Sequence, residues 1–258
     1  MTSSAVPLRY ANVDKDTGHK FALRIVMNLP LPGVRRSPLE VDELTHGNIC
    51  KPLSDTAITA VIRNAGTRIG VMRVALDQAT DALPPALARV FRVRGTSRAS
   101  APLLAGFFMY AEHEPCVLEY MCIKEDFRAY QLGSLLLRTY EEHVRALHPQ
   151  CSTLYAAALN DERVFNFYRQ NQYTVLDEAG VRARMDPPGQ AWDPAVTSEL
   201  SLRRSGTAGP VRIKLPFDTT LIVKDFAVVA APVAPSAFAT DVIDDDEYDD
   251  LYVLGQEI

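Results

Sequence analysis

The stretch "IKEDFRAYQLGSLLL", residues 123–137, decides how the middle of this chain folds. It holds an aromatic residue, an arginine and a single glycine, and a leucine-rich run follows at once. The two runs before it, "PLLAGFFMYAEHEP" (102–115) and "CVLEYMCI" (116–123), have the apolar and aromatic composition of two strands joined by a polar turn. Apolar residues recur at helical spacing after it, so the stretch is a turn from strand to helix. The first N–H groups of such a helix lack backbone acceptors and predict an anion site.

The residues that follow predict another strand and another helix. "STLYAAAL" (152–159) is the strand, and "NDERVFNFYRQN" (160–171) is the helix, capped by Asn160 or Asp161. A strand–helix–strand unit makes its two strands, here 116–123 and 153–159, parallel to each other. We therefore expect an α/β fold of the α+β type: a mixed, mostly antiparallel sheet with a central parallel pair and helices on both faces.

The rest of the chain predicts shorter elements on either side of this unit. Residues 21–29 are a first strand, residues 67–88 are ambiguous and compatible with a helix, and residues 89–95 alternate like a strand. "YTVLDEAGVRARMD" (173–186) predicts a closing hairpin. The expected divisions are an N-terminal segment (1–20), a main domain (21–186), a β-rich C-terminal extension (187–231), and a linker with an acidic tail that lacks fixed structure (232–258).

The composition is that of a globular protein, with 47% hydrophobic and 23% charged residues. The first residues have no signal-peptide pattern and no apolar run is long enough to span a bilayer, which predicts an intracellular, cytoplasmic protein without membrane contact. Four cysteines and five histidines show no metal-binding spacing, so no metal site is expected. We expect the cysteines to be free thiols in a reducing compartment.

The turn resembles the acyl-CoA-binding motif of the GNAT superfamily of N-acetyltransferases. In that family an apolar strand end is followed by a short link, an aromatic residue, and Arg/Gln-x-x-Gly-x-Gly/Ala at the start of a helix. Here Ile123, Phe127, Arg128 and Gly133 match, whereas Gln131 stands at the family's first glycine. The backbone amides of this turn hold the pyrophosphate of acetyl-CoA in the family. The resemblance therefore implies acetyl-CoA as co-substrate.

A second block, "LNDERVFNFYRQNQY", resembles the family's next motif. Tyr168 and Tyr173 stand at the positions of its aromatic residues, Asp161 takes the place of its asparagine, and Gln172 replaces a common glycine. The resemblance covers about residues 20–186 and implies that the two parallel strands splay apart to admit pantetheine. It assigns acetyl-CoA contacts to Met121, Cys122, Ile123, Arg128, Ala129, Tyr130, Gln131, Leu132, Gly133, Ser134 and Asn160.

The implied reaction is direct attack of a primary amine on the thioester, in a complex that holds both substrates. Strand amides near 121–123 would polarise the thioester carbonyl, and Tyr168 would protonate the leaving thiolate. The same tyrosine is compatible with a purely structural role in the core. Glu119, the one carboxylate inside an apolar strand, is either the general base or a residue at a wet edge. Cys122 is interpreted as a small buried hydrophobe.

Two functions from different classes remain open on the sequence. One is an acetyltransferase acting on a small molecule or a protein. The other is an inactive GNAT-fold scaffold that binds partners through its C-terminal extension and acidic tail.

The tail, residues 241–258, carries eight of the 32 acidic residues and no basic ones, so the body has 27 basic against 24 acidic residues. It is either a protein-binding segment or a solubilising one, and nucleic acid is not an expected partner. The acceptor and the oligomeric state are left open.

Overall fold

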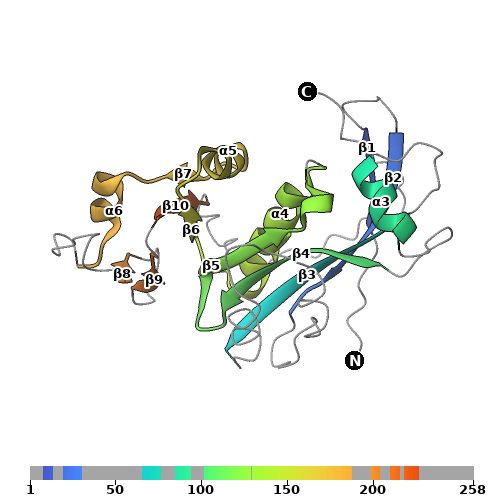
Figure 1. Ribbon diagram of the computed structural model, residues 1–258. Helices are drawn as coiled ribbons and strands as arrows, with labels where there is room; N and C mark the ends of the chain where they lie inside the picture. The colour runs from blue at the N-terminus through green and yellow to red at the C-terminus, as the bar shows by residue number, and fades with distance from the viewer. Residues whose placement is uncertain are drawn as a thin grey trace, which may run out of the picture. The chain divides into compact units, whose positions relative to one another are not determined.

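The computed structural model describes residues 8–13, 20–30, 66–76, 85–93, 102–128, 130–187, 199–203, 210–215 and 218–226. All of them belong to one compact unit, residues 1–226. Eight strands among these residues form one sheet in the order β1-β2-β3-β4-β5-β6-β10-β7 (Figure 1). Every neighbouring pair is antiparallel except β5 and β6, which are parallel. The expected mixed sheet with a central parallel pair is confirmed.

The first half of the sheet is a run of antiparallel strands. It consists of β1 (Leu8–Val13), β2 (Lys20–Asn28), β3 (Thr67–Leu76) and β4 (Leu103–Ala111). All nine residues of β4 are buried, because both faces of this central strand are covered. Two of these strands were not assigned from the sequence. Residues 8–13 are a strand paired with β2, and residues 67–76 are a strand where a helix was considered.

Helix α3 (Pro85–Val93) replaces the strand predicted for residues 89–95. Leu87 and Phe91 lie four positions apart and are both almost fully buried, as one face of a helix requires. The alternation of arginine with apolar residues suggested a strand, but burial follows the helical period. Arg89 lies on the exposed side and donates to Asp126 at 2.8 Å. The basic stretch that begins at Arg89 therefore starts on a helix.

The second half of the sheet carries the predicted strand–helix–strand unit. It contains β5 (Glu114–Ile123), a single 3-10 turn (Glu125–Phe127), α4 (Leu132–Leu147), β6 (Thr153–Leu159) and α5 (Glu162–Gln170). Asp161 caps α5 by accepting from the amide of Arg163, which decides between the two cap candidates. Among the described residues, no helix has the length and apolarity needed to cross a bilayer.

A correction concerns the end of the main domain. The predicted hairpin at 173–186 is instead a short strand, β7 (Thr174–Val175), followed by helix α6 (Glu178–Arg184). Asp177 caps α6 through a 2.7 Å bond from the amide of Gly180. The antiparallel partner of β7 is β10 (Thr219–Asp225), which enters the sheet between β6 and β7. The division at residue 186 is therefore wrong, since the β-rich region supplies a strand of the main sheet.

Residues 176–218 form an insertion between β7 and β10. It contains α6 and a two-stranded sheet of β8 (Glu199–Leu202) and β9 (Val211–Lys214). Its apolar residues pack on Val117, Tyr155, Leu221 and Val223 of the main sheet. The alternate residues Leu118, Ala156 and Ile222 face α4 and α5 instead. Because side chains alternate along strands, the insertion and the helices cover opposite faces of the sheet.

A nearly buried ion pair joins α4 to β10. Lys224 Nζ lies 2.7 Å from Glu141 Oε2, and their side chains are only 13% and 10% exposed. Arg145, one turn further along α4, lies over the ring of Phe226. The long-range pair holds the last strand against the helix layer.

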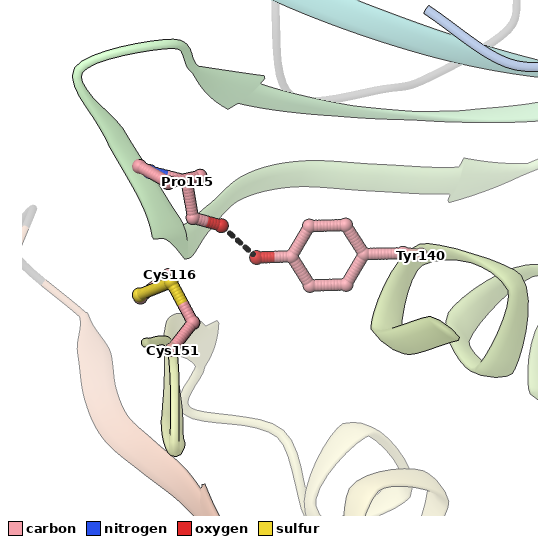
Figure 2. Close-up of a disulfide and its surroundings, with 4 residues drawn as sticks. All are labelled: Pro115, Cys116, Tyr140 and Cys151. Carbon is pink, nitrogen blue, oxygen red and sulfur yellow. Dashed lines mark hydrogen bonds between the residues drawn. A yellow bond between two sulfur atoms is a disulfide. The ribbon is translucent and has the colours of Figure 1, made fainter. Parts of the chain in front are cut away.

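A disulfide corrects the prediction of free thiols. Cys116, at the start of β5, is bonded to Cys151, which precedes β6 (Figure 2). Both residues are buried. Cys122 is also disulfide-bonded, so it is not the free hydrophobe that the sequence suggested. Disulfides are typical of oxidising compartments, and the cytoplasmic location stays a prediction.

Candidate functional site

The parallel strands β5 and β6 separate part of the way along their length. They pair only at Val117 with Tyr155 and at Leu118 with Ala156. β5 nevertheless continues to Ile123, and β6 continues to Leu159. A gap between the two strands therefore opens toward the turn that precedes α4. The splay expected from the motif resemblance is present.

A β-bulge at Glu119 marks the point where the gap opens. Met109 of β4 pairs with Tyr120, but the next residue, Tyr110, pairs with Leu118. Glu119 is thus an extra residue on β5. A bulge bends its strand and redirects its side chains. Here it turns the end of β5 away from β6.

The backbone of β5 beyond the bulge presents hydrogen-bonding groups to this gap. The amide of Lys124 donates to Ala105 of β4 at 2.8 Å. Because antiparallel ladders alternate, the peptide groups of Met121 and Ile123 face the opposite side, where pairing with β6 has ended. The amide of Cys122 faces β4, so of the three predicted strand contacts it is the one that the geometry excludes.

The facing edge of β6 follows the same rule. The amide of Asn160 donates to Asp218, just before β10, at 2.8 Å. Alternation then directs the peptide groups of Ala157 and Leu159 into the gap. The side chain of Asn160 accepts from Thr220 of β10, so this residue is held on the side away from the gap. It does not join the other predicted acetyl-CoA contacts.

The turn before α4 brings the predicted anion site to the open end of the gap. The helix begins at Leu132, and its first regular bond runs from Leu135 to the carbonyl of Gln131. The amides of Leu132, Gly133 and Ser134 therefore have no acceptor within the helix. They lie at the positive end of the helix dipole, which favours a phosphate group.

Arg128 lies at the same end of the gap. Its Nε donates to the carbonyl of Ile123 at 3.1 Å, and the side chain is exposed. The guanidinium is therefore held beside the last residue of β5. Among the described residues, its terminal amino groups form no hydrogen bond or ion pair, so they can bind an anion. Position and charge agree with the predicted phosphate contact.

The remaining turn residues have structural roles. Tyr130 packs edge-on against Phe21 of β2, with the ring centroids 5.6 Å apart, so its side chain turns toward the core. Leu132 is buried. A Cβ at Gly133 would lie 3.1 Å from Phe167 of α5, so this glycine permits close packing of α5 on α4. Ala129 lies outside the described residues.

Gln131 and Gln172 share an unusual backbone conformation. Their φ angles are 59° and 67°, in the left-handed region that glycine favours. These are the two positions where the motifs of the family have glycine. The chain thus keeps the glycine-type backbone at both sites while carrying a side chain there.

The two predicted catalytic side chains have different surroundings, because Tyr168 is buried in the main apolar cluster and Glu119 is exposed at the bulge. The pKa of Tyr140 is raised well above its usual value by burial, and the neighbouring Tyr168 and Glu119 contribute to that rise. Tyr140 Oη donates to the carbonyl of Pro115 at 3.0 Å, beside the disulfide (Figure 2). Glu119 follows directly on the paired positions Val117 and Leu118, so it lies where the gap begins.

Burial affects the acidity of both groups. It raises the pKa of Tyr168 to about 12, so its phenol keeps its proton at neutral pH. No described residue hydrogen-bonds to that hydroxyl. For Glu119, partial desolvation raises the pKa above its ordinary value, and the charges of His113 and Lys214 work against that rise. Tyr168 can therefore serve as a proton donor at neutral pH, and desolvation makes the Glu119 carboxylate a stronger proton acceptor than a free one.

Lys214 is the neighbour that the sequence did not reveal. It comes from the insertion, 95 positions beyond Glu119 along the chain (214 − 119 = 95). No motif surrounds it, and local periodicity could not place it. The bulge at Glu119 left no sequence signal either.

Comparisons with known proteins give the following result. No family model and no curated protein matches the chain. Similar solved structures include an IAA acetyltransferase from Bacillus cereus ATCC 14579, at 12% identity and a TM-score of 0.40, covering 78% of this chain and 99% of that one. Tetrahymena GCN5 has 12% identity and a TM-score of 0.41, with coverages of 80% and 96%. A Bacillus subtilis acetyltransferase in complex with CoA has 13% identity and a TM-score of 0.39, with coverages of 80% and 99%.

Proposed function

We propose that this chain is an N-acetyltransferase that transfers the acetyl group of acetyl-CoA to a primary amine. The observation that carries the proposal is the gap between β5 and β6, with the peptide groups of Met121 and Ile123 directed into it. Peptide groups inside a sheet are normally paired with a neighbouring strand. An extended, amide-containing chain such as pantetheine supplies the donors and acceptors that β6 no longer offers.

The ends of the gap match the ends of acetyl-CoA. At the open end, the α4 amino terminus and Arg128 bind the pyrophosphate by charge and by N–H donation. At the narrow end, the amide of Met121 donates to the thioester oxygen and stabilises the negative charge that develops there during attack. In this arrangement the thioester would lie beside the bulge.

The side chains at the narrow end move the protons. Glu119 accepts a proton from the acceptor ammonium, which frees the nitrogen lone pair for attack on the thioester carbon. As the C–N bond forms and the C–S bond breaks, Tyr168 donates its phenolic proton to the departing sulfur. The attacking nitrogen loses its second proton, which returns the tyrosine phenolate to the phenol, and Glu119 releases its proton to solvent. The products are an N-acetyl amide and CoA.

The test targets the amide of Met121. Met121→Pro removes that N–H, and because it faces away from β4, the substitution breaks no bond of the β4–β5 ladder. Met121→Ala is the matched control, since it removes the side chain and keeps the N–H. We expect Met121→Pro to weaken acetyl-CoA binding by tenfold or more in isothermal titration calorimetry, while Met121→Ala binds like the unchanged chain.

Two results would contradict the proposal. One is the absence of any thermal shift of the unchanged chain with millimolar acetyl-CoA. The other is equal acetyl-CoA affinity of the two variants, each shown to be folded by circular dichroism. Binding of acetyl-CoA without transfer to any amine would favour the scaffold function instead.

A further inference from the structure

A pocket of about 300 Å³ lies where helix α3, the start of β4 and the turn after β5 meet. A volume of this order lies at the lower end of the range found for small-molecule sites in proteins. The walls of the pocket are apolar and come from all three elements, as Val90 of α3, Leu103 and Leu104 of β4, and Phe127 of the turn. The pocket therefore offers a surface on which a flat, weakly polar group can pack.

Two contacts between α3 and the turn hold this pocket in shape. The ring of Phe91 on α3 packs edge-on against the ring of Phe127, with the centroids 6.3 Å apart, and both residues are buried. At the surface, Arg89 of α3 donates to Asp126 of the turn at 2.8 Å. Because a buried contact and a surface ion pair both fix α3 against the turn, the pocket is formed before any ligand binds.

The charged residues that line the pocket leave it with an excess of one positive charge. Arg89 and Lys124 are cations, and Asp126 is the one carboxylate among the lining residues. That carboxylate is already bonded to Arg89, whose guanidinium has further N–H donors. The side chain of Arg89 is 71% exposed, so these donors can reach a ligand at the mouth of the pocket. Apolar walls with a cationic mouth fit an organic anion.

The pocket adjoins the proposed pyrophosphate site through a single peptide group, the one that joins Ile123 to Lys124. Its N–H donates to Ala105 of β4 at 2.8 Å, next to the residues of β4 that line the pocket. Its carbonyl accepts from Arg128 at 3.1 Å. The N–H and C=O of a trans peptide point in opposite directions, so Arg128 and the pocket flank the end of β5. Because neighbouring strands are only about 4.8 Å apart, one ligand can reach both.

We propose that the pocket binds the 3′-phosphoadenosine end of acetyl-CoA, with the 3′-phosphate bound by Lys124 and Arg89 and the adenine packed on the apolar walls. In acetyl-CoA the pyrophosphate connects pantetheine to this end, so the end lies next to whatever site holds the pyrophosphate. The assignment rests on the proposed function, which places the pyrophosphate at Arg128. Lys124 and Arg89 touch neither the thioester nor the acceptor, so they determine donor specificity and take no part in the chemistry.

The experiment compares acetyl-CoA with 3′-dephospho-acetyl-CoA, which keeps the thioester, the pantetheine and the pyrophosphate. The dissociation constants of both donors for the full chain are measured by isothermal titration calorimetry. We expect acetyl-CoA to bind about tenfold more tightly, because charge-assisted hydrogen bonds to the 3′-phosphate are missing from the other complex.

Two variants test whether the pocket causes this preference. Lys124→Gln and Arg89→Gln should each reduce it to about threefold or less. Arg138→Gln is the matched control, because it removes a positive charge from an exposed position of α4 outside the pocket, and it should keep the full preference. Circular dichroism shows whether each variant is folded, and either pocket variant decides the question if the other does not fold. Equal affinity of the unchanged chain for the two donors, or a preference that the folded pocket variants keep, would overturn the inference.

Adenosine 3′,5′-bisphosphate separates this inference from the proposed function, because it carries the 3′-phosphoadenosine end without pantetheine or thioester. Binding of this fragment that depends on Lys124, without acetyl transfer to any amine, would support the pocket assignment and contradict the enzyme. Acetyl transfer with equal affinity for the two donors would support the enzyme and contradict the pocket assignment. Absence of both transfer and fragment binding would overturn both.

Discussion

Gln131 and Gln172 show how single residues depart from the rule that φ > 0 belongs to glycine. A side chain in the left-handed region costs about 1–2 kcal/mol relative to the right-handed one. Gln131 is also exposed at the turn that would hold the pyrophosphate. Gln172 follows α5 and lies outside that turn. Substitutions at the two positions can therefore distinguish the energetic cost of backbone strain from steric obstruction of the pyrophosphate by a side chain.

We expect both Gln131→Gly and Gln172→Gly to raise the free energy of unfolding by up to about 1 kcal/mol, since relief of strain is partly offset by the freer unfolded chain. Only Gln131→Gly should also tighten acetyl-CoA binding, by a few fold. Urea unfolding and calorimetry measure the two effects. Equal acetyl-CoA affinity of the two variants would show that the Gln131 side chain does not obstruct the pyrophosphate site.

The raised pKa of Glu119 predicts that the rate of acetyl transfer depends on pH. Its folded-state pKa is raised, chiefly by desolvation, and only the carboxylate can accept the proton of the ammonium. The rate should therefore be full above this raised pKa and should fall as the pH decreases through it. Glu119→Gln should lower kcat/KM by about 100-fold and remove this acidic limb. An acidic limb that persists in the variant would assign the base to another group.

At the scale of elements, the junction of β5 and β6 is held at one end and open at the other. The Cys116–Cys151 disulfide, the Tyr140 bond to Pro115 and the two paired positions all lie at the closed end. The bulge at Glu119 follows directly. The gap is therefore an opening between strands whose separation is limited by covalent and hydrogen-bonded contacts at its base.

Removal of the disulfide should lower the free energy of unfolding and weaken the binding of acetyl-CoA in the gap. The bond closes a loop with a sequence separation of 35 residues, for which chain entropy gives about 3–4 kcal/mol. We expect the double variant Cys116→Ala, Cys151→Ala to lose free energy of unfolding of this order, and to bind acetyl-CoA more weakly. Non-reducing peptide mass spectrometry of the unchanged chain should identify the linked pair. Two alkylatable thiols at these positions, found after unfolding without a reductant, would contradict the linkage.

The whole unit depends on a strand from far along the chain. β10 pairs with β6 over seven positions, from Thr219 with Leu159 to Asp225 with Thr153. Its buried residues Leu221, Ile222 and Val223 contribute to both apolar clusters, and Lys224 bonds to Glu141. Without β10, β6 would lose its antiparallel partner and β7 its only described neighbour in the sheet.

Two truncated chains test this dependence. Residues 1–226 comprise the entire first unit and should fold with the same thermal transition as the full chain. Residues 1–186, which end at the boundary suggested by the sequence, should not fold cooperatively. Circular dichroism and size-exclusion chromatography distinguish the two outcomes. A folded 1–186 chain would show that β10 is dispensable.

The sequence alone determined the core of the fold, from β4 to α5, and with it the turn at Arg128 and Gly133, the candidate Tyr168 and the candidate Glu119. These elements are encoded locally: the strands are short, nearly continuous apolar runs, apolar residues repeat every three to four positions in the helices, and the cap of α5 lies beside its helix.

Only the tertiary structure decided the rest: the bulge at Glu119, the disulfide, the place of β10 and the packing of β9 against β5. Each depends on which segments become neighbours, and pairing between distant strands leaves no trace in the local period of either one. The same holds for α3 and α6, where a mixed pattern fitted strand and helix alike until burial of one face decided between them.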